Sequence, residues 1–193
     1  MFGAIKHNLA NLFNFSGQDS RSTFWWYFLF LFILWIIAYV VMIVPVIAGA
    51  VGTAMDGAQS GVDQAAMEAE MQAQVLGSMG TLALNGLIIT LVFTLLIAAS
   101  LVRRARDAGK PGWWGAVPVV LNLVAAAIGY FVLQNILGQI GPEGLADPEA
   151  LMNGDVPGAV AGDLLGWLAI ILAIVIGVLP SAGVPANTHE EFE

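Results

Sequence analysis

One short stretch of the chain gathers most of its positive charge. From Arg103 to Lys110 lie four of the six basic residues, with Asp107 among them and a Trp pair shortly after. Arginine and lysine bind phosphate, and a carboxylate beside them is placed to act as an acid or base. These residue types are compatible with an enzyme that modifies phospholipids. We rank that hypothesis last, because the stretch brings no nucleophile and no metal-binding group with it.

The composition places the chain in a membrane. Hydrophobic residues make up 59% of the 193 residues and charged residues only 10%, with a mean hydropathy of +0.83. Water-soluble domains carry about 25% charged residues. The net charge of -8 excludes a generally basic surface for nucleic acid. The absence of cysteine excludes disulfides, thiolate zinc sites and cysteine nucleophiles.

Four apolar runs are long enough to position the charged stretch between helices. Crossing about 30 Å of hydrocarbon takes roughly 20 apolar residues in a helix. We predict spans at about 24–44, 81–102, 113–137 and 162–180, the first of them ending at Pro45. The fold class is therefore all-α, a polytopic membrane helix bundle of four transmembrane helices. With no linker and no convincing repeat, residues 1–193 form a single membrane domain.

The two loops away from the charged stretch differ in character. Met67 and Met71 continue a fourfold spacing after a start at Ser60 and Asp63 that resembles a capping box. This pattern predicts an amphipathic helix at about 62–78 on or near the outer face, which either packs on its own bundle, as we favour, or docks a partner. The loop at 138–163 is rich in Gly, Pro and Asp, with one short helix expected after Asp147. Its acids lack the spacing of a calcium loop, so we expect no metal and no cofactor.

Charge orients the spans. With both termini cytoplasmic, residues 1–23, 103–112 and 181–193 lie inside, and none of the basic residues lies outside. This bias is typical of bacterial inner-membrane proteins. The first 23 residues lack the order of a cleaved signal peptide, so we expect the first span itself to direct insertion. The basic residues so placed are Lys6, Arg21, Arg103, Arg104, Arg106 and Lys110.

Local signals at the inner face explain much of the charged stretch. Gly17 predicts a turn and Ser20 an N-cap for the first span. Trp113 and Trp114 fit an interfacial aromatic belt at the start of the third. Asp107 is not explained by topology alone. It is expected to pair with one of three arginines, at positions 21, 103 or 104, and pairing with position 21 would clasp the first helix to the turn between the second and third.

Polar residues within the spans are few and uncharged. Asn85 lies in the second span and Asn122 in the third. Such residues more often bridge helices by hydrogen bonds than line a substrate path, and Gly162 and Gly166 favour close helix packing. A path lined by the two asparagines remains the basis of an alternative, a small oligomeric transporter or channel.

Two motifs resemble a known family. The segments "FNFSGQDSRSTFWW" and "RRARDAGKPGWW" look like the pair of motifs of the domain of unknown function 805 family, small bacterial inner-membrane proteins of three or four spans. The chain departs from that pattern with Gln18 in place of Arg, Thr23 in place of Glu and Arg106 in place of His. The resemblance implies an inner-membrane location and a common fold, and it implies no activity. The matching residues are Phe15, Gly17, Arg21, Phe24, Trp25, Arg103, Arg104, Asp107, Gly109, Lys110, Gly112, Trp113 and Trp114.

The favoured function is that of a non-enzymatic integral membrane protein. Its inner-face motif would contact anionic phospholipid or another membrane protein, or serve as a structural clasp, and the oligomeric state stays open. The expected partners are the lipid bilayer and such a lipid or protein, with no nucleic acid. The residues of this motif are Arg21, Arg103, Arg104, Arg106, Asp107, Lys110, Trp113 and Trp114.

Overall fold

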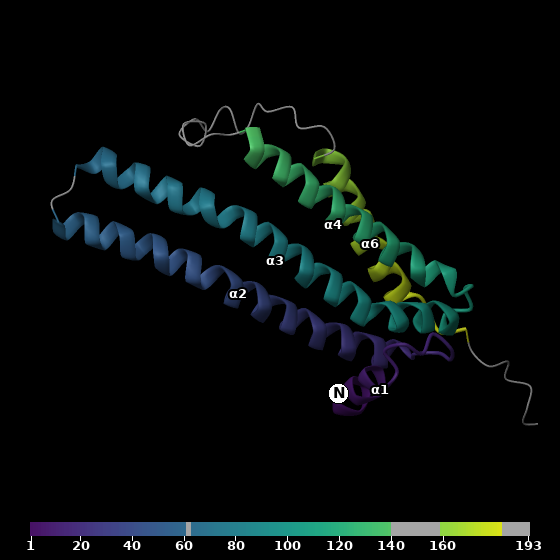
Figure 1. Cartoon of the computed structure of the whole chain (residues 1–193). Coiled ribbons are helices and arrows are strands. Elements are labelled where there is room, and N and C mark those ends of the chain that lie inside the picture. Colours follow the sequence, from purple (N-terminus) through teal and green to yellow (C-terminus); the bar gives the residue numbers. More distant parts are fainter. Residues whose placement is uncertain (61–62, 140–158, 183–193) are drawn as a thin grey trace, which may run out of the picture. The chain divides into compact units, whose positions relative to one another are not determined.

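The structure is a computed structural model that describes residues 1–60, 63–139 and 159–182 (Figure 1). All its regular elements are helices, and no strand occurs within these ranges, which confirms the predicted all-α class. The short helix expected after Asp147 lies outside the described residues. The helices are α1 (Phe2–Ala10), α2 (Arg21–Ser60), α3 (Gln64–Asp107), α4 (Trp113–Gln139) and α6 (Ala159–Val178).

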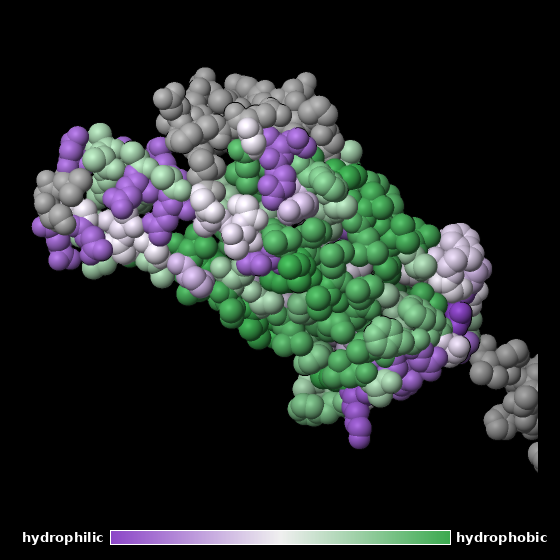
Figure 2. Space-filling model, in the orientation of Figure 1, coloured by the Kyte–Doolittle hydropathy of each residue, from purple (hydrophilic) through white to green (hydrophobic). Residues whose placement is uncertain are grey.

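The four longer helices are the predicted membrane spans. Each contains a stretch long and apolar enough to cross a membrane, with mean hydropathies between 2.2 and 2.9. Large apolar side chains are exposed along their sides, and Figure 2 shows hydrophobic residues covering much of the visible surface. Such exposure is the pattern of a multi-pass membrane protein, in which lipid covers these side chains.

Helix α2 is longer than the sequence predicts. The first span was expected to end before Pro45, but this proline lies inside a helix that continues to Ser60. The apolar and alanine-rich run goes on past the proline, and membrane helices tolerate an internal proline because neighbouring groups satisfy the freed carbonyl. At its other end α2 begins at Arg21, where the predicted Ser20 cap accepts a hydrogen bond from the Thr23 N–H at 3.2 Å.

The amphipathic segment predicted at 62–78 is not a separate element. It forms the first part of α3, which is continuous from Gln64 to Asp107. Ser60 belongs to α2 and does not begin α3; Asp63 lies directly before α3, and its carbonyl accepts the Met67 N–H at 3.1 Å. A hydrogen bond of 2.7 Å from Thr53 Oγ1 of α2 to Gln74 Oε1 of α3 joins the segment to the helix before it.

The chain divides into two compact units, each with its own packing. The first comprises Met1–Phe32, Thr94–Asn122 and the described residues from Trp167 onward, and the second comprises Ile33–Phe93 and Leu123–Gly166. In the second unit, α6 approaches α4 closely. A Cβ added at Gly162 would lie 3.0 Å from Ile128 Cγ2, and one at Gly166 would lie 3.8 Å from the Ala125 Cβ. Gly162 thus makes the close contact that the spacing favours, whereas a Cβ at Gly166 would be in ordinary van der Waals contact.

The first unit contains the hydrophobic core around which the charged stretch is arranged. Phe24, Leu101, Ala105 and Ile176 are each at most 2% exposed and pack together. Gly115 brings α4 onto α3 so closely that an added Cβ would overlap the Leu101 carbonyl. The core therefore fixes the start of α2, the end of α3, the start of α4 and the end of α6 against one another.

Candidate functional site

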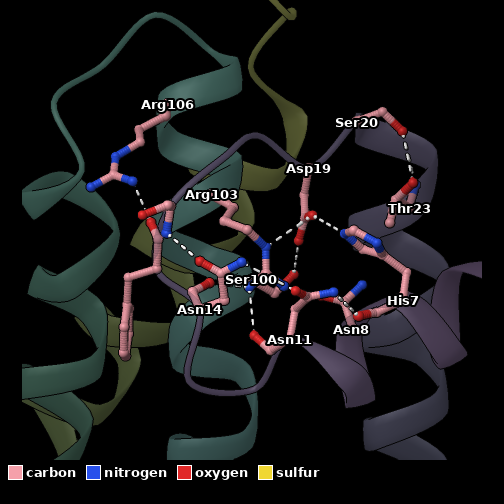
Figure 3. Close-up of polar contacts among 12 residues, drawn as sticks. His7, Asn8, Asn11, Asn14, Asp19, Ser20, Thr23, Ser100, Arg103 and Arg106 are labelled. Carbon is pink, nitrogen blue, oxygen red and sulfur yellow. Dashed lines mark hydrogen bonds and ion pairs between the residues drawn. The ribbon is translucent and has the colours of Figure 1, made fainter.

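A buried ion pair joins the segment before α2 to the end of α3. The Arg103 Nε lies 3.0 Å from Asp19 Oδ1, and the two side chains are 3% and 0% exposed. The contact is an ion pair without the alignment of a hydrogen bond. Ser100 Oγ donates to Asp19 Oδ2 at 2.9 Å, and His7 Nε2 lies 3.2 Å from Asp19 Oδ1 (Figure 3). We call these four residues together with Asn8 the clasp.

The remaining donors of Arg103 bind the N-terminal segment. Its Nη1 donates to the backbone carbonyls of Asn11 and Asn14 at 2.8 and 2.6 Å, and its Nη2 donates to Asn8 Oδ1 at 2.6 Å. Asn8 is itself 1% exposed and lies on α1. Burial of a guanidinium is costly unless its donors and its charge are matched. The clasp meets this requirement with one carboxylate and three oxygen acceptors (Figure 3).

A second group of side chains binds the C-terminal end of α6. Arg104, 0% exposed, donates to the carbonyls of Gly177 and Leu179, and Trp25 Nε1 donates to the Gly177 carbonyl at 3.1 Å. Arg21 Nη2 donates to the Val178 carbonyl at 2.6 Å. The last carbonyls of a helix have no partner within it and carry partial negative charge. Arg21, Trp25 and Arg104 satisfy them, and we call the three residues the α6 cap.

Asp107 pairs within its own helix. Of the three candidate arginines, Arg104 is its partner, at a spacing of three residues, whereas Arg21 binds α6 and Arg103 binds Asp19. The same carboxylate accepts a hydrogen bond from Ser181 Oγ at 2.5 Å, and the Asp107 carbonyl accepts the Ala182 N–H at 2.7 Å. Asp107 thus fastens the chain after α6 to the end of α3.

The other residues of the charged stretch point outward. Arg106 is exposed and donates to the Phe15 carbonyl (Figure 3). Lys110 is exposed, with its Nζ 5.6 Å from the centre of the Trp114 ring, and Trp113 is 62% exposed. Gly109, at φ +70°, makes the turn that follows α3 and leads to Lys110 and Trp113. Two cations of the stretch, Arg103 and Arg104, are therefore buried, and two, Arg106 and Lys110, reach the surface.

Sequence reasoning missed Asp19, the acid at the centre of the clasp. It is the one acidic residue among the first 23, and it lies between the Gly17 turn and the Ser20 cap. That isolation was the available signal, because a lone acid in a segment predicted to share one face of the membrane with all six cations suggests a pair. Asn8 was also missed, since an asparagine on a short helix carries no pairing information.

The intramembrane asparagines have different environments. Asn122 Nδ2 donates to Thr94 Oγ1 at 2.6 Å, which bridges α4 and α3. Asn85 is exposed on α3. Tyr27, 1% exposed, donates through its hydroxyl to the Leu96 carbonyl at 3.0 Å and so joins α2 to α3.

The polar groups of the clasp and of the α6 cap bond to one another and to backbone carbonyls, and they hold the ends of the helices in place. Ser100 and His7 both contact Asp19, so the imidazole Nε2 is directed at the carboxylate and not at the hydroxyl. A serine nucleophile requires the reverse order, with the base next to the hydroxyl. Among the described residues, no group of three or more His, Asp or Glu is placed to hold a metal ion.

Comparison with known proteins gives a family and no activity. The family model "Protein of unknown function (DUF805)" matches residues 12–187. No curated protein and no solved structure matches the chain significantly. The match spans both motifs and all four membrane-spanning helices, so the membership that the motifs predict is confirmed. The chain belongs to the DUF805 family of proteins of unknown function.

Proposed function

We propose that this chain is a non-enzymatic protein of the bacterial inner membrane whose cytoplasmic face binds anionic phospholipid headgroups. Both termini lie on the cytoplasmic side in this proposal. Arg106 and Lys110 contact the headgroups, and Trp113 and Trp114 rest at headgroup depth. The clasp and the α6 cap hold the surface that presents these residues.

The observation that carries the proposal is the division of the cations. Arg103 and Arg104 are 2% and 0% exposed, and their guanidinium groups donate hydrogen bonds to acceptors within the chain. Arg106 and Lys110 are exposed and have no carboxylate partner among the described residues. Exposed cations beside aromatic side chains at a membrane surface attract anionic lipid, with about 1 kcal/mol for each cation.

The observations favour binding over transport or catalysis. Transport along both asparagines would need two free amides at membrane depth, and although Asn85 is exposed, the Asn122 amide already bonds to Thr94. Catalysis by Asp107 would need a carboxylate open to substrate, and this one accepts from Arg104 and Ser181.

Lipid retention during purification tests the proposal. The variant Arg106→Gln with Lys110→Gln removes both exposed cations and leaves the clasp and the α6 cap intact. Wild type and variant are extracted with a mild detergent, and the lipids that remain bound are quantified by mass spectrometry. Glu70→Gln is the control, because it also neutralises one exposed charge but lies on α3 far along the sequence from the charged stretch.

The expected result is a fall in bound phosphatidylglycerol and cardiolipin relative to phosphatidylethanolamine in the double variant alone. Equal enrichment of anionic lipid in wild type and double variant would contradict the proposal. If Glu70→Gln reduced the enrichment as much as the double variant does, the effect would not belong to this surface either.

A further inference from the structure

Helix α1 turns its polar side toward the protein. His7 and Asn8 contact Asp19 and Arg103 of the clasp, and Asn8 is 1% exposed. The carbonyl of Asn11, directly after the helix, accepts a further hydrogen bond from Arg103. In a short helix on a water-soluble protein the arrangement is the opposite, with apolar side chains inward.

The same N-terminal segment also exposes large apolar side chains. Phe2 is 79% exposed and Phe13 is 89% exposed. Three more apolar side chains of the first 15 residues are also exposed, and one charged residue, Lys6, is exposed among them. Large apolar side chains gathered in this way on one segment mark a surface that contacts another phase or molecule. The three others are Met1, Leu9 and Phe15, at 56%, 42% and 45%.

The neighbouring surface indicates what covers these side chains. The clasp holds α1 against Asp19, two residues before the first turns of α2, and against Arg103 near the end of α3 (Figure 1). Those turns expose Trp26, Leu29 and Phe32 at 41%, 44% and 47%. Helix α2 is one of the four helices able to cross a membrane, so these side chains meet lipid. The exposed apolar side chains of α1 are therefore held close to the end of the protein at which that lipid-facing surface begins.

We infer that residues 2–13 form an interfacial anchor, with Phe2 and Phe13 inserted among the lipids of the leaflet at which α2 begins. Helices of this kind lie in the plane of the interface with their apolar side about 5–10 Å deep. Lys6 extends its stem along the apolar surface and its ammonium into water. Where a soluble helix would turn its polar side chains to water, α1 turns them to Arg103 and Asp19.

The family match adds an independent observation. It begins at residue 12, so α1 lies outside the matched range. The anchor extends across the start of the match, because Phe13 lies within the matched range. It also does not depend on the proposed binding of anionic headgroups, because insertion of phenylalanine requires only an interface.

Single-cysteine labelling tests the anchor cleanly, since the chain contains no cysteine. Phe2→Cys and Phe13→Cys are each labelled with the fluorophore NBD in the full chain, reconstituted into vesicles of phosphatidylcholine alone. A doxyl spin label is carried by the lipid at carbon 5 or at carbon 12 of the acyl chain. Gln18→Cys is the matched control, an exposed polar position in the same N-terminal segment.

We expect the carbon-5 label to remove most of the NBD emission at Phe2→Cys and Phe13→Cys, the carbon-12 label to remove less, and neither to quench Gln18→Cys to the same extent. Lipid quenching at positions 2 and 13 no stronger than at position 18 would overturn the inference. Protection of these labels from aqueous iodide without lipid quenching would overturn it as well, because protein and not lipid would then cover them. Loss of anionic-lipid retention in the Arg106 and Lys110 variant has no bearing on this result, since the vesicles are uncharged.

Discussion

The clasp makes a quantitative prediction about Asp19. Replacing it with Asn keeps the size of the side chain and removes the charge that faces the buried guanidinium of Arg103. Removing one partner of a buried ion pair costs about 3–5 kcal/mol. Arg103 keeps its three hydrogen bonds to the N-terminal segment, so we expect Asp19→Asn to lower the free energy of unfolding by about 3 kcal/mol, the lower end of that range.

Truncation to Ala is expected to cost more. Asp19→Ala also leaves the Ser100 hydroxyl, on a residue 1% exposed, without its acceptor, which adds about 1–3 kcal/mol. The pairing itself is measured by a double-mutant cycle with Arg103→Met. Removal of both charges leaves no uncompensated ion, so the double variant is expected to lose about 2 kcal/mol less than the two single variants together.

The assay is unfolding of the full chain by sodium dodecyl sulfate in mixed micelles, followed by far-ultraviolet circular dichroism. Glu70→Gln, which neutralises an exposed side chain, gives the background effect of losing a carboxylate. If Asp19→Asn destabilised the protein no more than Glu70→Gln, or if the cycle gave additive losses, Asp19 and Arg103 would not form the buried pair on which the reasoning depends.

Three other contacts lead to predictions of the same kind. Gly115→Ala puts a Cβ against the backbone of α3 and is expected to cost about 1–3 kcal/mol, whereas Gly3→Ala, in open space, should change stability little; equal effects in the unfolding assay would contradict the close approach. Arg104→Gln removes a buried charge and two donors to the carbonyls at the end of α6, so we expect the free energy of unfolding to fall by about 3 kcal/mol. Amide hydrogen exchange in the last turn of α6 should also become faster, and unchanged exchange there would refute the α6 cap. Asn122→Leu breaks the bridge to α3 and should cost about 1 kcal/mol, while Asn85→Leu at an exposed position should not, as the same unfolding curves would show.

The fold was largely predictable because its signals are local. Long charge-free runs define the four membrane-spanning helices, and Ser20 and Gly17 mark the start of α2 by the local geometry that they favour. Pro45 misled because in water an internal proline usually ends a helix, and the sequence alone does not say which groups surround it. The helix predicted at about 62–78 was recognised by its fourfold spacing of methionines. That it continues into the second span without a turn could not be predicted, because this spacing does not indicate where a helix ends.

The site was predictable in its location and less so in its pairings. The motif residues and the two helix ends were identified, because positive charge and tryptophan gather there. Their partners were not identified. The acceptors of the Arg103 hydrogen bonds lie 89 to 95 positions away in the chain, and no spacing rule links residues so far apart. Asp107 was expected to pair with Arg21, Arg103 or Arg104 because it lies among the cations. The core instead brings Asp19 to Arg103 and leaves Asp107 to Arg104.

The central claim is that the surface cations, and not the buried ones, select anionic lipid. The most direct test is electron spin resonance of the full chain in vesicles, with spin-labelled phosphatidylglycerol and phosphatidylcholine compared for their association with the protein. We predict that wild type prefers phosphatidylglycerol, and that Lys110→Gln and Arg106→Gln each lower the ratio of association constants roughly fivefold, about 1 kcal/mol for each cation. An unchanged ratio in the double variant, under conditions where its unfolding matches that of wild type, would contradict the account.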